Sequence, residues 1–352
     1  MSGGWHSPAF WWQARPSLAA RLLAPLGRIY GAVTAARMDR KPRARPKIPV
    51  ICIGNLVAGG SGKTPFALAL AGLLADAGER PVFLTRGYGG RLSGATPVQV
   101  EPRHHTAADV GDEALLLAGC RPTVICPDRV AGASIAETLG SVILMDDGFQ
   151  NPSLEKTVSL VLLDAASGIG NGQCLPAGPL RAPVARQLPH GHALVVAGEG
   201  AGAEPVRSAA QARALPVFEA RIEPCNAALV DGLSVLAFSG IGRPEKFVES
   251  LTRAGATVVG QRFFGDHHTF REAEARQLLD AANAGGLTLV TTAKDHVRLG
   301  GVQAPALNEL AARSLVLEVE MRLREPAGLV ALLLDRIAAF RARSQAVSPV
   351  SL

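Results

Sequence analysis

Short, continuously apolar runs alternate with longer segments of helical periodicity along most of the chain. Before residue 198, runs typical of strands buried on both faces of a parallel sheet occur at 48–53, 81–85, 123–126, 142–145, 158–163 and 193–197. After residue 215, a second series predicts strands at 234–239, 257–264, 287–292 and 314–320, and helices at 244–254, 271–283 and 326–343. Because strands that alternate with helices form parallel βαβ units, the pattern predicts an α/β fold with a doubly wound, mainly parallel sheet and a second, smaller α/β domain.

The same pattern divides the chain into three parts. We predict an N-terminal arm over 1–47, a first domain over 48–215 and a smaller domain over 216–352. Residues 198–215 are rich in Ala and Gly, and we expect them to form a surface connection between the two domains.

The N-terminal arm differs from the rest of the chain in its apolar pattern. A helix is predicted over 18–37, with one apolar stripe formed by Leu22, Leu26, Ile29 and Val33. Pro25 lies inside this helix and is expected to kink or interrupt it. All three tryptophans precede the helix, at Trp5, Trp11 and Trp12. Aromatic residues beside an apolar stripe are typical of a helix in a membrane interface. The alternative is an arm that packs on its own domain.

Charge is also concentrated in the arm. It carries nine basic residues and one acid, against 27 and 29 in the remainder, so the arm has a net charge of +8 and the body −2. A nearly neutral body argues against a basic face that binds nucleic acid. The five cysteines are scattered, with no CxxC pair, which argues against a disulfide framework or a structural zinc site. With neither a bilayer-spanning apolar run nor a signal-peptide pattern, we expect a soluble body that faces the cytoplasm.

The strongest chemical signal is a glycine-rich loop between the first predicted strand and a predicted helix over 64–78. Backbone amides of such a loop converge on phosphate oxygens, and the helix N-terminus adds positive partial charge. Lys63 is expected to reach the β- and γ-phosphates, and the Thr64 hydroxyl to bind magnesium. The predicted nucleotide-binding residues are Val57, Ala58, Gly59, Gly60, Ser61, Gly62, Lys63 and Thr64. The standard motif has glycine at the position of Val57, so the loop is atypical; a glycine-rich turn with a solvated lysine is the alternative.

A second signal is the pair Asp146 and Asp147 at the end of the apolar strand 142–145. A carboxylate delivered there beside a phosphate loop can hold magnesium directly or through water. Alone, an acidic strand end is usually a turn or a helix cap. Next to the phosphate loop we interpret both aspartates as metal candidates, one of them serving a neighbouring role.

Several motifs occur in a fixed order along the chain. They are Gly54-Asn55-Leu56 before GGSGKTP, Arg86-Gly87-Tyr88, Gly111-Asp112-Glu113, Asp146-Asp147-Gly148-Phe149-Gln150, Leu175-Pro176-Ala177-Gly178-Pro179-Leu180-Arg181, Phe238-Ser239-Gly240-Ile241-Gly242 and Asp266-His267-His268. Together they resemble the motifs of the tetraacyldisaccharide 4′-kinase family, the lipid A 4′-kinases of Gram-negative bacteria. The DDGFQ and PxGPLR motifs are the most specific of the set. The resemblance extends from the aromatic N-terminus to about Asp295.

The resemblance implies a fold of the P-loop NTPase type that uses ATP and Mg²⁺. It implies transfer of the γ-phosphate to the 4′-hydroxyl of a tetraacylated glucosamine disaccharide 1-phosphate, a step of lipid A biosynthesis. Because a lipid kinase must take its substrate from the bilayer, the resemblance also favours membrane association for the arm over 1–47. The expected location is peripheral, on the cytoplasmic face of the inner membrane, and no obligate protein partner is inferred. In this family the aspartate at Asp112 is viewed as the base that activates the sugar hydroxyl, with His267 as its partner.

The resemblance also implies roles for three further residues. Arg181 is expected to hold a guanidinium over phosphate oxygens, and Arg129 to act similarly. Tyr88 corresponds to a lipid-contacting position. The family commonly has glutamate after the PLR arginine, where this chain has Ala182.

Most of these residues also have an ordinary structural interpretation that involves neither catalysis nor binding. Asp112 precedes an apolar helical run and is by default an N-cap. His267 is adjacent to His268, and the residues alone do not decide between them. An exposed arginine at 129 is usually only solvated, and a tyrosine between glycines is often a turn residue.

Two other functions use the same loop. A nucleotide-hydrolysing switch or metallochaperone ATPase/GTPase is the main alternative, but Lys294-Asp295 lacks the spacing of the guanine-reading NKxD motif and no Cys or His cluster is present. A nucleic-acid-dependent ATPase is disfavoured by the charge of the body and the lack of aromatic stacking motifs.

Overall fold

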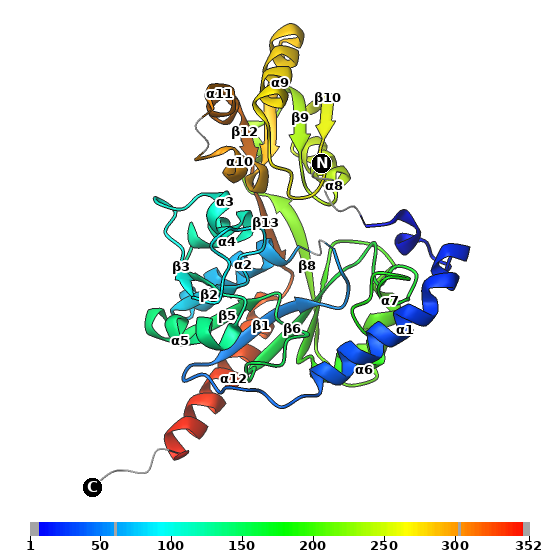
Figure 1. The fold of residues 1–352 in the computed structure, drawn as a ribbon, viewed down its shortest axis with the longest axis vertical. Helices are drawn as coiled ribbons and strands as arrows, with labels where there is room; N and C mark the ends of the chain where they lie inside the picture. Colours follow the sequence, from blue (N-terminus) through cyan, green and yellow to red (C-terminus); the bar gives the residue numbers. More distant parts are fainter. Residues whose placement is uncertain (1–6, 60–61, 302–303, 348–352) are drawn as a thin grey trace.

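Two sheets flanked by helices make up the fold (Figure 1). The structure, a computed structural model, describes residues 7–59, 62–301 and 304–347. The larger sheet contains β1 (Val50–Asn55), β2 (Pro81–Thr85), β3 (Val98–Gln99), β4 (Thr123–Ile125), β5 (Val142–Asp146), β6 (Val158–Asp164), β7 (Ala193–Ala197), β8 (Val217–Pro224) and β13 (Val319–Leu323). Its order is β13-β8-β7-β6-β1-β5-β2-β4-β3. The predicted doubly wound, mainly parallel sheet is confirmed.

The centre of the larger sheet determines where chemistry can take place. β1 lies between β5 and β6 and pairs in parallel with both, with Ile53 opposite Asp146 in one register and Gly54 opposite Val161 in the other. These strands are buried on both faces, as their continuous apolar runs predicted. The carboxyl ends of β1, β5 and β6 therefore meet at one edge of the sheet, which is where open α/β sheets bind ligands.

The helices around this sheet are mostly short. They are α1 (Leu18–Met38), α2 (Lys63–Asp76), α3 (Ala107–Val110), α4 (Asp112–Ala118), α5 (Arg129–Leu139), α6 (Val184–Gln187), α7 (Glu204–Gln211) and α12 (Pro326–Val347), with 3₁₀ turns η1 (Ala9–Trp12) and η2 (Leu188–His190). A third 3₁₀ turn, η3 (Ala227–Leu229), follows β8 and packs against the smaller sheet. The expected surface connection over 198–215 thus contains a helix, α7, whose Val206 and Ala210 are buried. Because the buried side chains of α7 are small, the sequence shows little apolar periodicity there, and the pattern predicted a connection instead of a helix.

The smaller sheet belongs to an insertion between β8 and β13. It contains β9 (Ser234–Ser239), β10 (Thr257–Phe263), β11 (Thr288–Thr292) and β12 (Leu315–Leu317) in the parallel order β10-β9-β11-β12. Its helices are α8 (Pro244–Arg253), α9 (Glu272–Gly285), α10 (Ala293–Leu299) and α11 (Pro305–Arg313). We call the part from β9 to β12, which lies above the larger sheet in Figure 1, the small domain.

The structure differs from the predicted boundary near residue 215. The single strand expected over 314–320 is two strands on either side of Glu318, and they join different sheets. β13 pairs antiparallel with β8 at the edge of the larger sheet, and α12 buries Leu329, Leu333 and Ile337 in the core that this sheet shares with α2. The chain therefore leaves the large domain after β8 and returns to it at β13.

The arm helix α1 has two different faces. Its buried face is small and consists of Ala20, Gly27, Gly31, Ala35 and Met38. There is no room for larger side chains, since a Cβ at Gly31 would lie 2.7 Å from the Cys174 sulfur. The opposite face exposes the predicted apolar stripe, with Leu22 73% and Val33 65% exposed. The arm thus packs on its own domain and still presents its large apolar side chains outward.

Two details of the arm refine the predictions. α1 runs without a break through Pro25 and is capped by Ser17, whose side chain accepts a hydrogen bond from the Ala20 N–H. Trp11 is buried and donates its indole N–H to the Pro176 carbonyl at 3.0 Å, while Trp5 lies outside the described residues. Within the described residues, no helix has the length and hydrophobicity needed to cross a bilayer.

Two glycines provide a matched test of this packing. A Cβ at Gly54 in β1 would lie 2.3 Å from the Phe149 Cβ, whereas a Cβ at Gly72 in α2 would meet nothing within 4 Å. We expect Gly54→Ala to lower the free energy of unfolding by about 1–3 kcal/mol through overpacking. Gly72→Ala should raise it by about 0.5–1 kcal/mol because alanine is the better helix former. Urea denaturation followed by circular dichroism measures both; a Gly54→Ala protein as stable as wild type would contradict the packing.

Candidate active site

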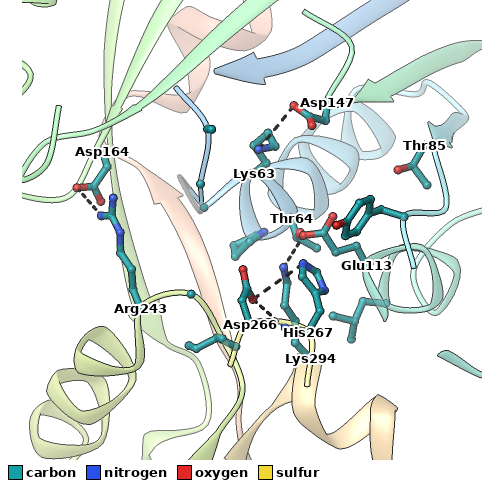
Figure 2. Close-up of a pocket in the computed structure, with 18 of the residues that line it drawn as sticks. Lys63, Thr64, Thr85, Glu113, Asp147, Asp164, Arg243, Asp266, His267 and Lys294 are labelled. Carbon is teal, nitrogen blue, oxygen red and sulfur yellow. Dashed lines mark hydrogen bonds and ion pairs between the residues drawn. The ribbon is translucent and has the colours of Figure 1, made fainter. Parts of the chain in front are cut away.

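A large cleft lies between the two domains, at the edge where β1, β5 and β6 end. Its volume is about 1430 Å³. It is lined by the arm at Trp12 and Arg37, by the phosphate loop at Lys63, and by the small domain at His267 and Lys294. Figure 2 shows Lys63, His267 and Lys294 pointing into one space from elements far apart in the sequence. The volume exceeds that of a typical pocket for one small ligand, so there is room for two reactants side by side.

The phosphate loop has the predicted strand–loop–helix context. It follows β1 and runs into α2, with Gly59 and Gly62 at φ 117° and 80°, conformations that favour glycine. The Ala58 N–H donates to the Pro179 carbonyl at 2.7 Å, which attaches the loop to the segment carrying Arg181. Of the predicted residues, Gly60 and Ser61 lie outside the described residues. Thr64 is buried in the first turn of α2 and borders the cleft.

The two aspartates after β5 occupy different environments. Asp146 is 1% exposed, and burial raises the pKa of its carboxyl to about 7. Its Oδ1 accepts no hydrogen bond from the described residues. A buried, unpartnered carboxylate oxygen at the end of the strand beside β1 fits a ligand of Mg²⁺, which characteristically takes one or two carboxylates and completes its shell with phosphate and water. The described residues contain no cluster of three or more metal-binding side chains.

Asp147 instead holds two cations. Its Oδ1 lies 3.7 Å from Lys63 Nζ and its Oδ2 accepts a hydrogen bond from Arg181 Nη2 at 3.2 Å. Burial raises the pKa of this carboxyl, but Lys63 and Arg181 outweigh burial and hold the pKa well below its usual range. Both oxygens are therefore engaged with the cations that a phosphate group would meet. Of the two metal candidates, the geometry favours Asp146.

Arg181 borders the cleft as predicted, and its orientation does not require the missing glutamate. Its Nε donates to the Val57 carbonyl and its Nη1 to Gln150 Oε1, each at 3.3 Å. Gln150 is in turn fixed by its amide, which donates to the Asn55 carbonyl and to Gln187 Oε1 at 2.7 and 2.9 Å. These contacts and Asp147 together orient Arg181. The orientation therefore does not depend on a polar side chain at Ala182.

The two weaker substrate candidates lie in contrasting positions. Arg129 is 3% exposed, and its guanidinium donates to the Cys126 carbonyl at 2.6 Å and the Asp146 carbonyl at 3.4 Å. It joins the ends of β4 and β5 rather than standing free. Tyr88 is 67% exposed, and its ring meets the His267 imidazole edge-on with centroids 5.5 Å apart. Tyr88 therefore stands at the mouth of the cleft beside the histidine.

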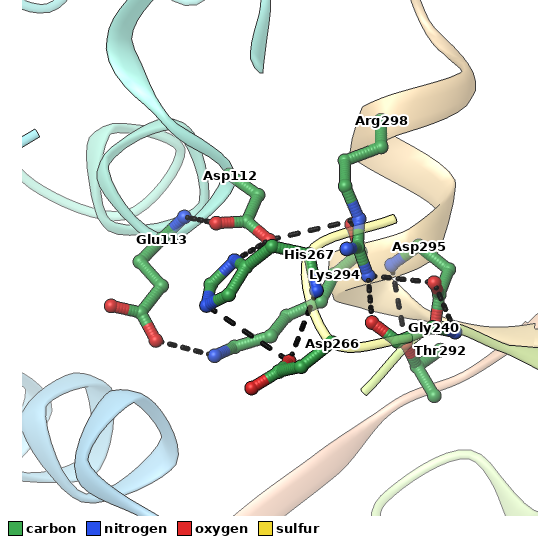
Figure 3. A network of polar contacts seen from close by, with 9 residues as sticks. All are labelled: Asp112, Glu113, Gly240, Asp266, His267, Thr292, Lys294, Asp295 and Arg298. Atoms are coloured by element: carbon green, nitrogen blue, oxygen red, sulfur yellow. Dashed lines mark hydrogen bonds and ion pairs between the residues drawn. The ribbon is translucent and has the colours of Figure 1, made fainter. Parts of the chain in front are cut away.

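A hydrogen bond between His267 and Asp112 is among the contacts that join the two domains at the cleft. His267 Nδ1 lies 3.1 Å from Asp112 Oδ2 (Figure 3). Asp112 is the first residue of α4, and its Oδ1 accepts the Glu113 N–H at 2.8 Å. His267 lies in the loop between β10 and α9 with φ 57°. His268 faces the other way: it stacks on Phe264 and bonds Glu274 at 2.8 Å. The structure thus places His267, and not His268, on Asp112.

The electrostatics of this pair are unequal. Burial raises the pKa of Asp112, but the His267 hydrogen bond and the charges of Lys294 and Arg298 outweigh burial and lower the pKa to about 2. The Asp112 hydrogen bond raises the pKa of His267 above its usual value, against the opposing effect of burial. Asp112 is therefore the anion of the pair, and the imidazole, whose pKa lies above its usual value, is the group that gains or loses a proton.

Other charged residues of the cleft were not predicted as site residues. Lys294 lies 2.5 Å from Glu113 Oε1, and Arg298 Nε lies 3.6 Å from Asp112 Oδ2. At the other end of the cleft, Arg243 bonds buried Asp164 at 3.1 Å and stacks over the Trp12 ring at 5.1 Å. Lys294 was considered only as part of an incomplete guanine motif; its place after a strand, at the start of a helix, was the available signal.

Comparison with known proteins gives consistent matches. A family model described as tetraacyldisaccharide-1-P 4′-kinase matches residues 19–338. The tetraacyldisaccharide 4′-kinase of Methylobacterium nodulans is 53% identical, covering 95% of this chain and 96% of that protein. The enzyme of the same name from Rhodopseudomonas palustris is 48% identical, covering 94% and 97%. A crystal structure of LpxK from Aquifex aeolicus in complex with ATP superposes with a TM-score of 0.68 at 25% identity, covering 91% of this chain and all of that one.

The unequal pair leads to a prediction about the titration of His267. Asp112→Asn removes the negative charge that stabilises the imidazolium, so the pKa of His267 should fall. NMR titration of protein with ¹³C-labelled histidine measures this pKa directly, and His267→Gln assigns the resonance. His268→Gln is the matched control and should leave the titration in place. An unchanged His267 pKa in Asp112→Asn would mean that the hydrogen bond does not form in solution.

Proposed function

The chain belongs to the tetraacyldisaccharide-1-P 4′-kinase family, and we propose which of its residues carry out the reaction of these lipid A 4′-kinases. The enzyme uses ATP. We infer that the nucleotide phosphates lie on the loop of residues 57–64 and that the acceptor is the 4′-hydroxyl of a tetraacylated glucosamine disaccharide 1-phosphate. The observation that carries this assignment is the Asp112–His267 pair, whose histidine lines the same cleft as Lys63 and Thr64 while Asp112 is buried behind it.

The proton of the acceptor hydroxyl passes to His267 in this proposal. A carboxylate whose pKa is about 2 is a weak base, and Asp112 is held in that state by its neighbours. Its hydrogen bond orients the imidazole and fixes a proton on Nδ1, which leaves Nε2 as the acceptor. Nε2 lies 3.9 Å from Asp266 Oδ1, beyond hydrogen-bond distance. We therefore reverse the roles implied by the family resemblance: His267 is the base and Asp112 orients it. Such a base contributes roughly a hundred- to ten-thousand-fold in rate.

The transferred phosphoryl group is stabilised mainly by fixed positive charge. Lys63 and Arg181 converge on Asp147 from two elements. We assign both cations to the γ-phosphate. Asp146 and Thr64 would hold Mg²⁺, which neutralises charge on the phosphate oxygens when it is bound. Asp147 keeps Lys63 and Arg181 in place and is not assigned to the metal. The nucleotide-switch alternative is not favoured.

We assign the arm to the membrane surface that holds the lipid substrate. The outward stripe of α1 gathers large apolar side chains on a helix that also carries Arg21, Arg28 and Arg37. Each basic residue near an anionic leaflet contributes on the order of 1 kcal/mol, and the stripe adds apolar burial. Because ATP is cytoplasmic, this surface is the cytoplasmic face of the inner membrane. Arg37 and Tyr30 of the same helix also line the cleft, so a lipid headgroup has a direct path from membrane to site.

The reaction itself is tested by transfer of labelled γ-phosphate from Mg-ATP to the tetraacylated disaccharide 1-phosphate in detergent micelles. Wild type should label the lipid, and Lys63→Ala should reduce the rate by at least about 100-fold because the charge on the phosphates is lost. Arg276→Ala, which removes an exposed arginine of α9, is the control. ATP hydrolysis without labelled lipid would contradict the proposed lipid phosphorylation and favour a nucleotide-hydrolysing switch.

The arm makes a separate prediction. The triple variant Leu22→Gln, Ile29→Gln, Val33→Gln removes three of the four side chains of the outward stripe, leaving Leu26, without altering the buried face of α1. We expect it to bind anionic vesicles at least about 10-fold more weakly, a loss of about 1.4 kcal/mol or more, and to raise KM for the lipid but not for ATP. Vesicle sedimentation and steady-state kinetics measure this. Ile135→Gln, at an exposed apolar position on α5, is the control. Unchanged vesicle binding by the triple variant would rule out the stripe as the membrane contact.

A further inference from the structure

Two cations of α10 reach across the cleft to two consecutive acids of α4. Lys294 Nζ lies 2.5 Å from Glu113 Oε1, and Arg298 Nε lies 3.6 Å from Asp112 Oδ2 (Figure 3). The two cations are four residues apart, so they lie on one face of α10, one turn from each other. The acids form the first turn of α4, in the large domain. The start of α4, which carries Asp112, is thus held by the small domain that carries His267.

The two cations differ in what else they hold. Arg298 also donates to Asp295 Oδ1 at 2.6 Å and to the Gly240 carbonyl at 2.9 Å, and its side chain is 6% exposed. These contacts lie inside the small domain, so Arg298 is part of that domain's own structure. Lys294 is 28% exposed, borders the cleft and directs its ammonium out of the small domain to Glu113. Lys294 can therefore be changed without dismantling the small domain.

His267 is surrounded by charges of both signs. It faces Asp112 and Glu113 from α4, Asp266 from its own loop, Lys294 and Arg298 from α10, and the Tyr88 ring from the loop after β2. The Asp112 hydrogen bond raises the pKa of the imidazole, burial lowers it, and the charge of Lys294 lowers it further. Loss of Lys294 should therefore raise the pKa of His267, opposite to the effect of losing Asp112.

We propose that Lys294 is a positioning residue for phosphoryl transfer, which holds Glu113 across the cleft and thereby keeps Asp112 in place to orient His267. The proposal rests on the roles assigned to Asp112 and His267 above. Lys294 acts through the first turn of α4: Glu113 directly follows Asp112, and its backbone N–H donates to Asp112 Oδ1 at 2.8 Å. The contact between Lys294 and Glu113 therefore also fixes the position of the Asp112 carboxylate.

The test is the pH dependence of kcat/KM for Lys294→Met, with a conservative variant beside it. We expect Lys294→Met to lower kcat by about 10-fold or more, since a small misplacement of a catalytic group has effects of this size. KM for ATP should change by less than about 3-fold. The acid limb of the profile should move to higher pH. Lys294→Arg keeps the charge and should restore the wild-type limb and most of kcat; Lys294→Gln serves if the methionine variant does not fold.

Lys246→Met is the matched control. Lys246 also forms an ion pair between the domains, with Asp164 of β6, but it contacts neither Asp112 nor His267. Its loss likewise removes one ion pair between the domains, so an effect that comes only from a weaker domain contact should appear in both variants. The acid limb of Lys246→Met should stay where it is in wild type.

A double-mutant cycle identifies the route through Glu113. If Lys294 acts through Glu113, Lys294→Met should cost much less in kcat when Glu113 is already glutamine. A folded Lys294→Met enzyme with the kcat and acid limb of wild type would overturn the proposal, as would failure of Lys294→Arg to restore either. Absence of lipid phosphorylation by wild type would instead contradict the proposed function.

Discussion

The hydrogen bond between His267 and Asp112 joins residues of two domains that the chain connects only at 225–233, after β8, and at Glu318, before β13. An imidazole and a carboxylate 3.1 Å apart form a base only while both domains keep their relative positions. The rest of the cleft serves that constraint. Lys294 and Arg298 hold α4 at one end, and Asp164 holds the start of α8 at the other through Arg243 and Lys246. Because these contacts are ionic, they tolerate small movements of the domains better than an apolar interface of fixed shape.

The second constraint is that the acceptor hydroxyl is attached to a lipid. The two faces of α1 meet this constraint: one face packs on the domain and the other points outward. Small residues such as Gly27 and Gly31 bring α1 into close contact with the segment that leads to Arg181, while Leu22 and Val33 remain outside. Trp12 then connects the arm to the cleft, since it lies beside Gly59 of the phosphate loop and under Arg243 of the small domain. The arm, the phosphate loop and the small domain therefore meet at one point.

Much of the fold follows from local pattern. Strands such as β1 and β5 could be predicted because they are buried on both faces and therefore appear in the sequence as short, continuous apolar runs. A helix of the same length does not show such a run. The insertion of the small domain was not recognised, because only tertiary pairing separates β12 from β13 on either side of Glu318. In the site, motifs and a family resemblance supplied Lys63, Asp112 and His267. The choice against His268 depends on the contact of His267 with Asp112 and of His268 with Glu274, and the role of Lys294 depends on a contact between domains. Neither is visible in one sequence.

The central claim is that Asp112 and His267 act as one unit across the cleft. It is tested most directly by kcat for lipid phosphorylation in Asp112→Asn, His267→Gln and the double variant, all verified as folded. If Asp112 works by orienting the imidazole, its loss has no further effect once His267 is absent, and the double variant should be as slow as His267→Gln alone. If the two losses multiply, the residues act independently, and the pair seen in the cleft is not the base.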